Sequence, residues 1–198
     1  MFLWYNIGVV NENQNQNRKS IRLKEYDYSE PGDYFITICT QNRGCLFGEV
    51  VDEKIVLNEV GQIAERCYLE IPKHFPNVEL DIFQIMPNHI HFLIRIMCQD
   101  NDNQNCRGAV SAPNGQIQRG ETPPLQKTPT LGQVVGYFKY QTTKKINEIS
   151  GTIGAPIFQR NYYEEIIKNE KHYSEVYTYI ESNPQVWDRD IDNPNKTI

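Results

Sequence analysis

Residues 78–97 constrain the fold of this chain more than any other stretch. Segments 78–86 and 89–97 are largely apolar and rich in β-branched and aromatic residues, and Pro87 and Asn88 separate them. Segments of this length and composition are typical of strands, and a Pro-Asn pair is typical of a turn. The sequence therefore predicts two consecutive strands and a fold built on a sheet.

Further strands are predicted upstream of this pair. Residues 34–40 (YFITICT) are almost all β-branched or aromatic. Residues 46–57 contain two short apolar runs on either side of Asp52 and Glu53, which is the pattern of a hairpin. We therefore expect one strand and one hairpin in this part of the chain.

Two amphipathic helices are predicted from apolar spacing and capping residues. Asn58 can cap a helix that Pro72 ends, and Thr130 with Gln133 forms a capping-box pattern at the start of another. The apolar positions recur at helical spacing in both: Val60, Ile63, Ala64, Cys67 and Ile71 in the first, and Leu131, Val134, Val135, Phe138 and Ile146 in the second.

The C-terminal part of the chain predicts one more helix. Residues 170–183 have a helical pattern that Pro184 stops, whereas residues 158–167 (FQRNYYEEII) are ambiguous between strand and helix. Helices that alternate with antiparallel-type strands indicate an α+β fold, with the helices packed on one face of a single sheet.

Length and low-complexity segments define the expected domain organisation. A chain of 198 residues is long enough for one sizeable core and short for two. The polar run NENQNQN makes residues 1–17 an expected disordered tail, and residues 99–129, rich in Asn, Gln, Gly and Pro, an expected flexible insertion. We therefore predict a single domain over residues 18–198.

Cysteine usage and the N-terminal sequence bear on the compartment. The five cysteines are odd in number and form no CxxC pair, which favours a reducing cytoplasm over a disulfide framework or a zinc knuckle. Residues 1–10 are apolar, but they lack a basic n-region and a polar run follows them, so neither a signal peptide nor a membrane span is expected.

The formal net charge of -5 argues against a generally basic nucleic-acid-binding surface. Positive charge is nevertheless concentrated locally, because residues 18–24 contain four basic side chains and residues 136–147 contain three, with no acidic residue in either segment. Such short runs are compatible with phosphate contacts and equally with an ordinary solvated surface.

His89 and His91 form the most informative pair of polar residues in the sequence. They are two apart on a predicted strand, so both side chains leave the same face, about 7 Å apart along the backbone, and can share one metal ion. Ile90, Phe92 and Ile94 then point into the core, which leaves the histidines on the opposite face with little apolar company.

The spacing of the histidines leaves several interpretations open. One histidine could be a surface residue and the other a core residue with its hydrogen bonds satisfied. If the pair binds metal, a zinc hydrolase, a non-haem iron site and a hard-cation site that handles phosphate oxygens are all possible, because no third ligand is evident nearby.

Tyr179 and Asn183 could complete such a site. They are four residues apart on the predicted helix 170–183, so a phenolic oxygen and an amide oxygen lie on one helical face. The alternatives are that Asn183 is simply the residue at a helix end before Pro184, and that Tyr179 is one of twelve tyrosines used in packing.

Several separated motifs in one order extend these observations over residues 18–187. They are RKSIRLKEYDYSEPGDYFITICT, LFGEV, MPNHIHFLI, LGQVVGYFK, FQRNYYEEII and YIESNP. In these motifs the chain resembles the REP-associated tyrosine transposases, a branch of the single-tyrosine HUH transposases within the IS200-like transposase family. The resemblance implies the HUH endonuclease fold, a ferredoxin-like antiparallel sheet with the His-hydrophobe-His pair on a central strand.

The resemblance also implies an activity and its residues. His89 and His91 match the metal-binding pair, Tyr179 matches the catalytic tyrosine of a late helix, and Asn183 matches a third metal ligand. The implied enzyme uses Mg²⁺ or Mn²⁺ to cleave and rejoin single-stranded DNA next to hairpins of REP-like palindromes, through a 5′-phosphotyrosine intermediate. We expect a monomer or a homodimer.

The candidate contacts to the DNA backbone are six basic residues: Arg18, Lys19, Arg22, Lys139, Lys144 and Arg160. Tyr140, Tyr137 and Tyr163 compete with Tyr179 for the role of nucleophile. Two rival functions are open: a catalytically silent hairpin-binding protein or repressor on the same fold, and a small metallohydrolase.

Overall fold

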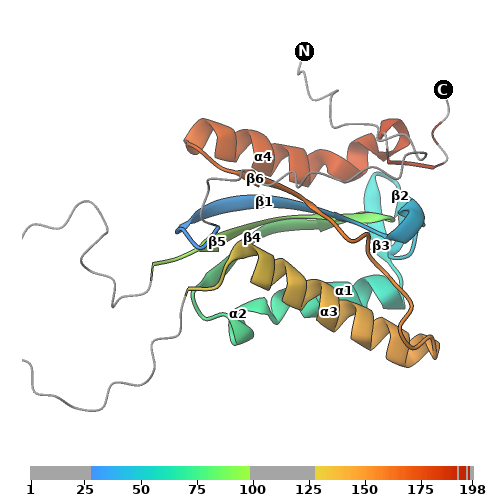
Figure 1. Cartoon of the computed structure of the whole chain (residues 1–198). Coiled ribbons are helices and arrows are strands. Elements are labelled where there is room, and N and C mark those ends of the chain that lie inside the picture. The colour runs from blue at the N-terminus through green and yellow to red at the C-terminus, as the bar shows by residue number, and fades with distance from the viewer. Residues whose placement is uncertain (1–27, 99–127, 191, 195, 197–198) are drawn as a thin grey trace, which may run out of the picture.

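A four-stranded antiparallel sheet in the order β4-β5-β1-β6 forms the centre of the computed structural model (Figure 1). The structure describes residues 28–98, 128–190, 192–194 and 196. The expected N-terminal tail and all but the last two residues of the expected insertion lie outside them. The strands are β1 (Gly32–Cys39), β4 (Val78–Ile85), β5 (His89–Ile96) and β6 (Tyr163–Ile166).

The predicted strands 34–40, 78–86 and 89–97 are confirmed as β1, β4 and β5, and the ambiguous stretch 158–167 contains the short strand β6. β1 and β5 are the two central strands and pair over their full length, with Cys39 opposite His89 and Thr37 opposite His91. The histidine pair therefore lies in the middle of the sheet and near one end of it.

The predicted hairpin at residues 46–57 is confirmed as β2 (Gly48–Val51) and β3 (Lys54–Leu57), a separate two-stranded sheet. Asp52 and Glu53 at its tip have φ angles of 49° and 61°. Two consecutive residues with positive φ are what a tight two-residue turn between twisted antiparallel strands requires. The short 3-10 helix η1 (Gln41–Arg43) joins β1 to this part of the chain.

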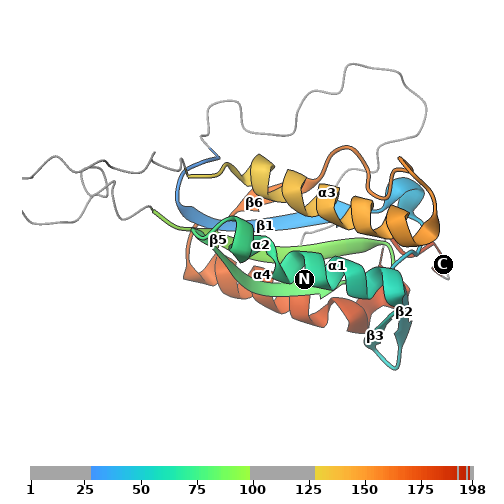
Figure 2. The same ribbon diagram turned by 90° about the horizontal axis from the view of Figure 1, so that it is seen from below.

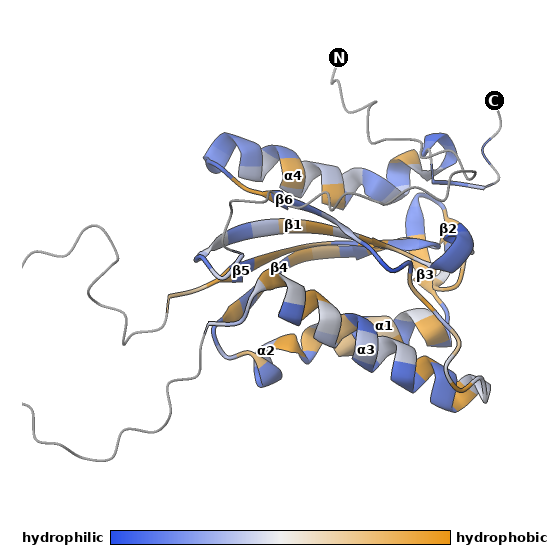
Figure 3. Ribbon diagram, viewed as in Figure 1, coloured by the Kyte–Doolittle hydropathy of each residue, from blue (hydrophilic) through white to orange (hydrophobic). Residues whose placement is uncertain are grey.

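Two of the predicted helices cover one face of the sheet, as α1 (Glu59–Leu69) and α3 (Leu131–Ser150) (Figure 2). The Asn58 side chain accepts a hydrogen bond from the Gly61 N–H, and Thr130 forms the predicted capping box. The apolar faces of both helices pack on Tyr34, Ile36 and Ile38 of β1 and on alternate residues of β5, forming the main core (Figure 3).

The third predicted helix is α4 (Glu170–Ser182), which covers the opposite face of the sheet (Figure 1). The α+β class is confirmed, but the prediction that the helices pack on one face is wrong. Val176 and Ile180 of α4 pack on Phe35 and Leu93 in a second, smaller core. Residues that alternate along one strand point to opposite faces, so β1 and β5 carry apolar side chains for both cores.

α1 and α4 end at Leu69 and Ser182, before Pro72 and Pro184 as predicted, and each proline lies in a short helical turn that follows. Pro72 lies in α2 (Ile71–His74), and Pro184 lies in the 3-10 helix η2 (Asn183–Arg189), which continues directly from α4. Proline fits in the first turn of a helix because its missing N–H has no intrahelical acceptor there. Within the described parts of the chain, no helix has the length and apolar character needed to span a membrane.

Candidate active site

His89 and His91 lie side by side on the face of the sheet that α4 covers. Their ring centroids are 4.5 Å apart, and the residues are only 1% and 3% exposed. Phe35 stacks on the His91 ring at 5.6 Å, and Trp187 of η2 packs on His89 at 6.0 Å. The prediction that the pair has little apolar company is therefore wrong, because α4 and η2 bring aromatic side chains to this face.

Hydrogen bonds fix the orientation and the tautomer of His89. The Asn88 Nδ2 amide donates to the carbonyl oxygens of Arg43 at 3.1 Å and Asp192 at 2.6 Å. The amide oxygen of Asn88 therefore faces His89 Nδ1, at 2.9 Å, and this nitrogen must donate the hydrogen bond. The lone pair of the ring is then on Nε2, which is buried and has no hydrogen-bond partner among the described residues.

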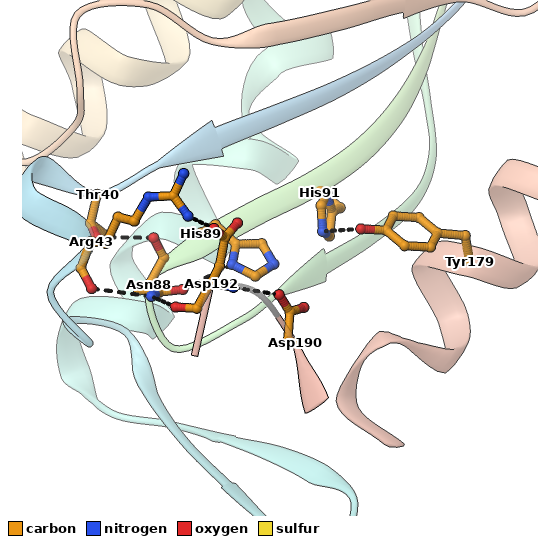
Figure 4. Close-up of polar contacts among 8 residues, drawn as sticks. All are labelled: Thr40, Arg43, Asn88, His89, His91, Tyr179, Asp190 and Asp192. Atoms are coloured by element: carbon orange, nitrogen blue, oxygen red, sulfur yellow. Dashed lines mark hydrogen bonds and ion pairs between the residues drawn. The ribbon is translucent and has the colours of Figure 1, made fainter. Parts of the chain in front are cut away.

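His91 is held in a similar way. Its Nδ1 lies 2.8 Å from the hydroxyl oxygen of Thr37, the residue directly opposite on β1. Its Nε2 lies 3.4 Å from the phenolic oxygen of Tyr179 on α4, and the two rings meet edge to face (Figure 4). A hydrogen bond at Nδ1 is typical of metal-binding histidines, because it orients the ring and leaves Nε2 free to bind the ion.

Burial keeps both imidazoles uncharged. It lowers the pKa of His89 to about 4, although the nearby Asp190 carboxylate and the Asn183 amide act in the opposite direction. Burial, with the neighbouring His89 as a lesser cause, lowers the pKa of His91 well below its usual value. A neutral imidazole has the free lone pair that a metal ligand needs, so both rings are in the competent protonation state at neutral pH.

The Tyr179 hydroxyl points toward His91. The residue as a whole is partly open to solvent, with 39% of its surface exposed. Burial of the hydroxyl and, to a lesser degree, the Asp190 charge raise the pKa of Tyr179 to about 12, whereas the Asn183 amide lowers it. The phenol is therefore protonated at neutral pH in the metal-free protein, and a nearby cation would favour its ionisation.

Asn183 lies at the junction of α4 and η2 and is 1% exposed. Both amide atoms are buried without a hydrogen-bond partner in the described structure, although the amide is close enough to His89 and Tyr179 to affect the pKa of each. Buried polar atoms without partners are unfavourable by roughly 1–3 kcal/mol each. His89 Nε2 and the Asn183 amide oxygen are therefore suited to bind a divalent cation with His91.

The predicted metal ligands and the predicted nucleophile thus come together from β5, α4 and η2. Within the parts of the chain that the structure describes, no three His, Cys, Asp or Glu side chains are close enough together to hold a metal ion. A cation at this site would therefore depend on the Asn183 amide and on ligands from outside the chain, such as water or phosphate.

The competing tyrosines occupy different places. Tyr137 and Tyr140 lie on α3, on the other side of the sheet from His89 and His91, with Tyr137 stacked on His74 and Tyr140 63% exposed. Tyr163 lies on the same face as the histidines, but its hydroxyl donates to Glu165 at 2.9 Å.

Two of the predicted DNA contacts, Lys139 and Lys144, lie on α3, on the other side of the sheet from the histidines (Figure 1). Lys144 lies on the exposed side of α3, 3.9 Å from Glu148, and Arg160 is exposed beyond the end of that helix. The Lys139 ammonium donates to the carbonyl oxygens of Gln159 and Arg160, so it ties α3 to the segment that precedes β6. Three further candidates lie outside the described residues: Arg18, Lys19 and Arg22.

Three polar residues beside the histidines were not predicted from the sequence: Thr37, Asn88 and Asp190. Asn88 precedes the histidine pair in the MPNHIHF segment, and its position there is the one signal that could have drawn attention to it. The partner of its amide, Asp192, is 104 residues away, and the position of Thr37 opposite His91 depends on strand register. Neither is visible in a single sequence.

Comparison with known proteins gives the class of fold first. The structure of a REP-associated tyrosine transposase bound to a REP hairpin matches with a TM-score of 0.50 and 17% identity, over 85% of this chain and 73% of that chain. The fold is therefore that of this class of transposase, as the sequence motifs predicted. A Deinococcus radiodurans R1 protein named as a transposase matches with a TM-score of 0.44 and 13% identity, over 81% of this chain and 95% of that one.

An uncharacterized protein of Haemophilus influenzae Rd KW20 is 38% identical over 186 residues, covering 94% of this chain and 95% of that protein. The chain belongs to the same protein family as this Haemophilus protein. No family model matches the sequence.

Proposed function

We propose that this protein is a metal-dependent, single-tyrosine transposase or endonuclease that cleaves and rejoins single-stranded DNA beside hairpins. The observation that carries the proposal is the convergence of Tyr179 from α4 on two neutral, oriented imidazoles of β5, with the phenolic oxygen 3.4 Å from His91 Nε2. The shared fold with a REP-associated tyrosine transposase supports it.

In this proposal His89, His91 and Asn183 hold a divalent cation, Mg²⁺ or Mn²⁺. The hydrogen bonds at Nδ1 of the two histidines fix the orientations of the rings. Bound there, the cation would supply Lewis-acid polarisation of the scissile phosphate. Aromatic side chains around the pair, among them Phe35 and Trp187, exclude bulk water from the rings.

Tyr179 is the nucleophile. Its phenol loses a proton, its oxygen bonds to phosphorus, and the bond from phosphorus to the 3′-oxygen breaks, with that oxygen taking up a proton. The products are a 5′-phosphotyrosine linkage and a free 3′-hydroxyl. The covalent linkage keeps the energy of the phosphodiester, so a 3′-hydroxyl can attack it and rejoin strands without ATP.

The proposed substrate is a single strand next to an imperfect hairpin, in line with the REP hairpin bound by the transposase of similar fold. Lys144, on the far side of the sheet from Tyr179, and Arg160, which follows a residue bonded to β1 at the edge of the sheet, are exposed candidate phosphate contacts.

The proposal is tested with a 3′-labelled, single-stranded oligonucleotide that carries an imperfect palindrome from the DNA flanking the gene, in the presence of Mg²⁺ or Mn²⁺. We expect a labelled covalent adduct with the wild-type protein and none with Tyr179→Phe. Tyr177→Phe is the matched control, because Tyr177 is an exposed tyrosine two residues earlier on the same helix. Tyr140→Phe tests the competing tyrosine of α3.

The outcomes separate the rival functions. An adduct that persists in Tyr179→Phe would contradict the assignment of the nucleophile. Hairpin binding that survives chelation, with no adduct under any metal, would indicate a catalytically silent DNA-binding protein. Tight stoichiometric zinc without preference for single strands would indicate a metallohydrolase.

A further inference from the structure

Asp190 places a carboxylate beside the histidine pair that the proposed function does not use. It is the residue directly after η2, and its N–H donates to the carbonyl oxygen of Trp187, the residue whose ring packs on His89. One carboxylate oxygen accepts the Asp192 N–H at 2.8 Å. In Figure 4 the carboxylate lies next to the His89 ring and on the side toward Tyr179.

The segment that carries Asp190 is tied to the same amide that orients His89. Asn88 donates to the carbonyl oxygen of Asp192 and accepts from His89 Nδ1, so one side chain sets the positions of both the ring and the segment. Arg43 forms an ion pair with the Asp192 carboxylate. These contacts hold the segment after α4 and η2 in place against the start of β5.

The charges around the site make the position of Asp190 significant. Two neutral imidazoles and one amide carry no negative charge, whereas hard divalent cations such as Mg²⁺ and Mn²⁺ are usually bound through carboxylate oxygens and retained waters. The nearby guanidinium of Arg43 is already paired with Asp192. The Asp190 carboxylate therefore interacts electrostatically with His89, and the exposed Lys196 is a further charged neighbour of Asp190.

We propose that Asp190 is a fourth residue of the cation site, where its carboxylate accepts hydrogen bonds from waters on the ion and supplies the negative charge that His89, His91 and Asn183 lack. The inference rests on the proposed function, because it assigns a role towards the same cation. Direct coordination is not required, since His89, His91 and Asp190 do not form a three-ligand cluster in the described structure.

The test measures Mn²⁺ affinity by isothermal titration calorimetry on the full chain without DNA, so the readout does not depend on cleavage. We expect Asp190→Asn to weaken Mn²⁺ binding by about tenfold or more, which is typical when a group that bonds to a ligand or a bound water is removed. Asp188→Asn is the matched control: the same chemical change on an exposed residue of η2, expected to alter affinity by about twofold at most.

A second variant, Asp190→Glu, keeps the charge and is expected to retain more affinity than Asp190→Asn. Equal affinities of the wild type and Asp190→Asn, with His91→Ala unable to bind Mn²⁺, would overturn the role of Asp190 and leave the proposed metal site intact. Equal losses in Asp190→Asn and Asp188→Asn would overturn it as well, because only general charge would then matter. A wild-type chain that binds no Mn²⁺, or binds it as tightly as His91→Ala does, would contradict both proposals.

Discussion

Replacing Asn88 tests whether one buried amide organises the site. The side chain is 1% exposed and makes three hydrogen bonds, to the carbonyl oxygens of Arg43 and Asp192 and to His89 Nδ1. At about 1 kcal/mol for each bond, Asn88→Ala should reduce the free energy of unfolding by about 3 kcal/mol. The loss should be largest at the buried His89 bond, because the freed Nδ1–H has no access to water.

The same substitution should weaken metal binding. Without the Asn88 oxygen, His89 can rotate and can place its proton on Nε2, so Mn²⁺ affinity is expected to fall by about 10- to 100-fold. Asn88→Asp keeps an acceptor for His89 Nδ1 but cannot donate to the two carbonyls. It should therefore be destabilised by a similar amount or more while retaining more of the affinity.

The assays are urea unfolding followed by circular dichroism and calorimetric titration of folded protein with Mn²⁺. Asn58→Ala is the control, because the Asn58 amide also both donates, to the carbonyl oxygen of Leu46, and accepts, from the Gly61 N–H, but bonds to neither histidine. It should lose stability and keep its Mn²⁺ affinity. If Asn88→Ala and Asn58→Ala bind Mn²⁺ equally well, the reasoning about the His89 tautomer is refuted.

Three further predictions concern stability. Ile180→Ala and Ile63→Ala, both in buried core positions, should each lower the free energy of unfolding by about 2–5 kcal/mol. Only Ile180→Ala, which loosens α4 next to Tyr179, should also reduce adduct formation by the folded protein. Thr130→Ala should destabilise by about 1 kcal/mol in urea, because it removes the capping box of α3, and no loss would contradict that role. The Lys145 ammonium lowers the pKa of Glu70, so the pair stabilises the fold above the ordinary carboxyl pKa and this contribution is lost as the pH falls through the lowered value. Because both side chains are more than a third exposed, the effect should be at most about 1 kcal/mol, and Glu70→Gln should remove that part of the acid sensitivity in unfolding curves at pH 7 and pH 3.

The fold was predictable where local signals and tertiary packing agree. The Asn58 cap, the Thr130 capping box and the turn before His89 are encoded in adjacent residues, and all three were predicted correctly. The position of α4 was not, because its apolar residues Val176 and Ile180 show that it packs on something without showing on which face. The environment of the histidines was missed for the same reason.

The candidate site was only partly predictable. Spacing predicts that His89 and His91 share one face of a strand and that Tyr179 and Asn183 share one face of a helix. The approach of the two pairs to each other depends on where α4 crosses the sheet. The interaction of Asn88 with Asp192 joins residues that no local pattern connects. The structure also shows that the Lys139 ammonium bonds to backbone carbonyls, which composition could not distinguish from a surface charge.

The direction of β5 separates the histidine pair from the opposite end of the sheet. The strand begins at His89, at the end of the sheet that carries the histidine pair, and ends at Ile96, about 24 Å away at the other end. The helix that follows next in the described chain also begins at that far end, where the Leu131 N–H donates to the carbonyl oxygen of Tyr28. Both anchors of segment 99–127 thus lie remote from Tyr179. Substitutions at this end of the sheet, around Ile96 and Leu131, should therefore leave the arrangement of His89, His91 and Tyr179 unchanged.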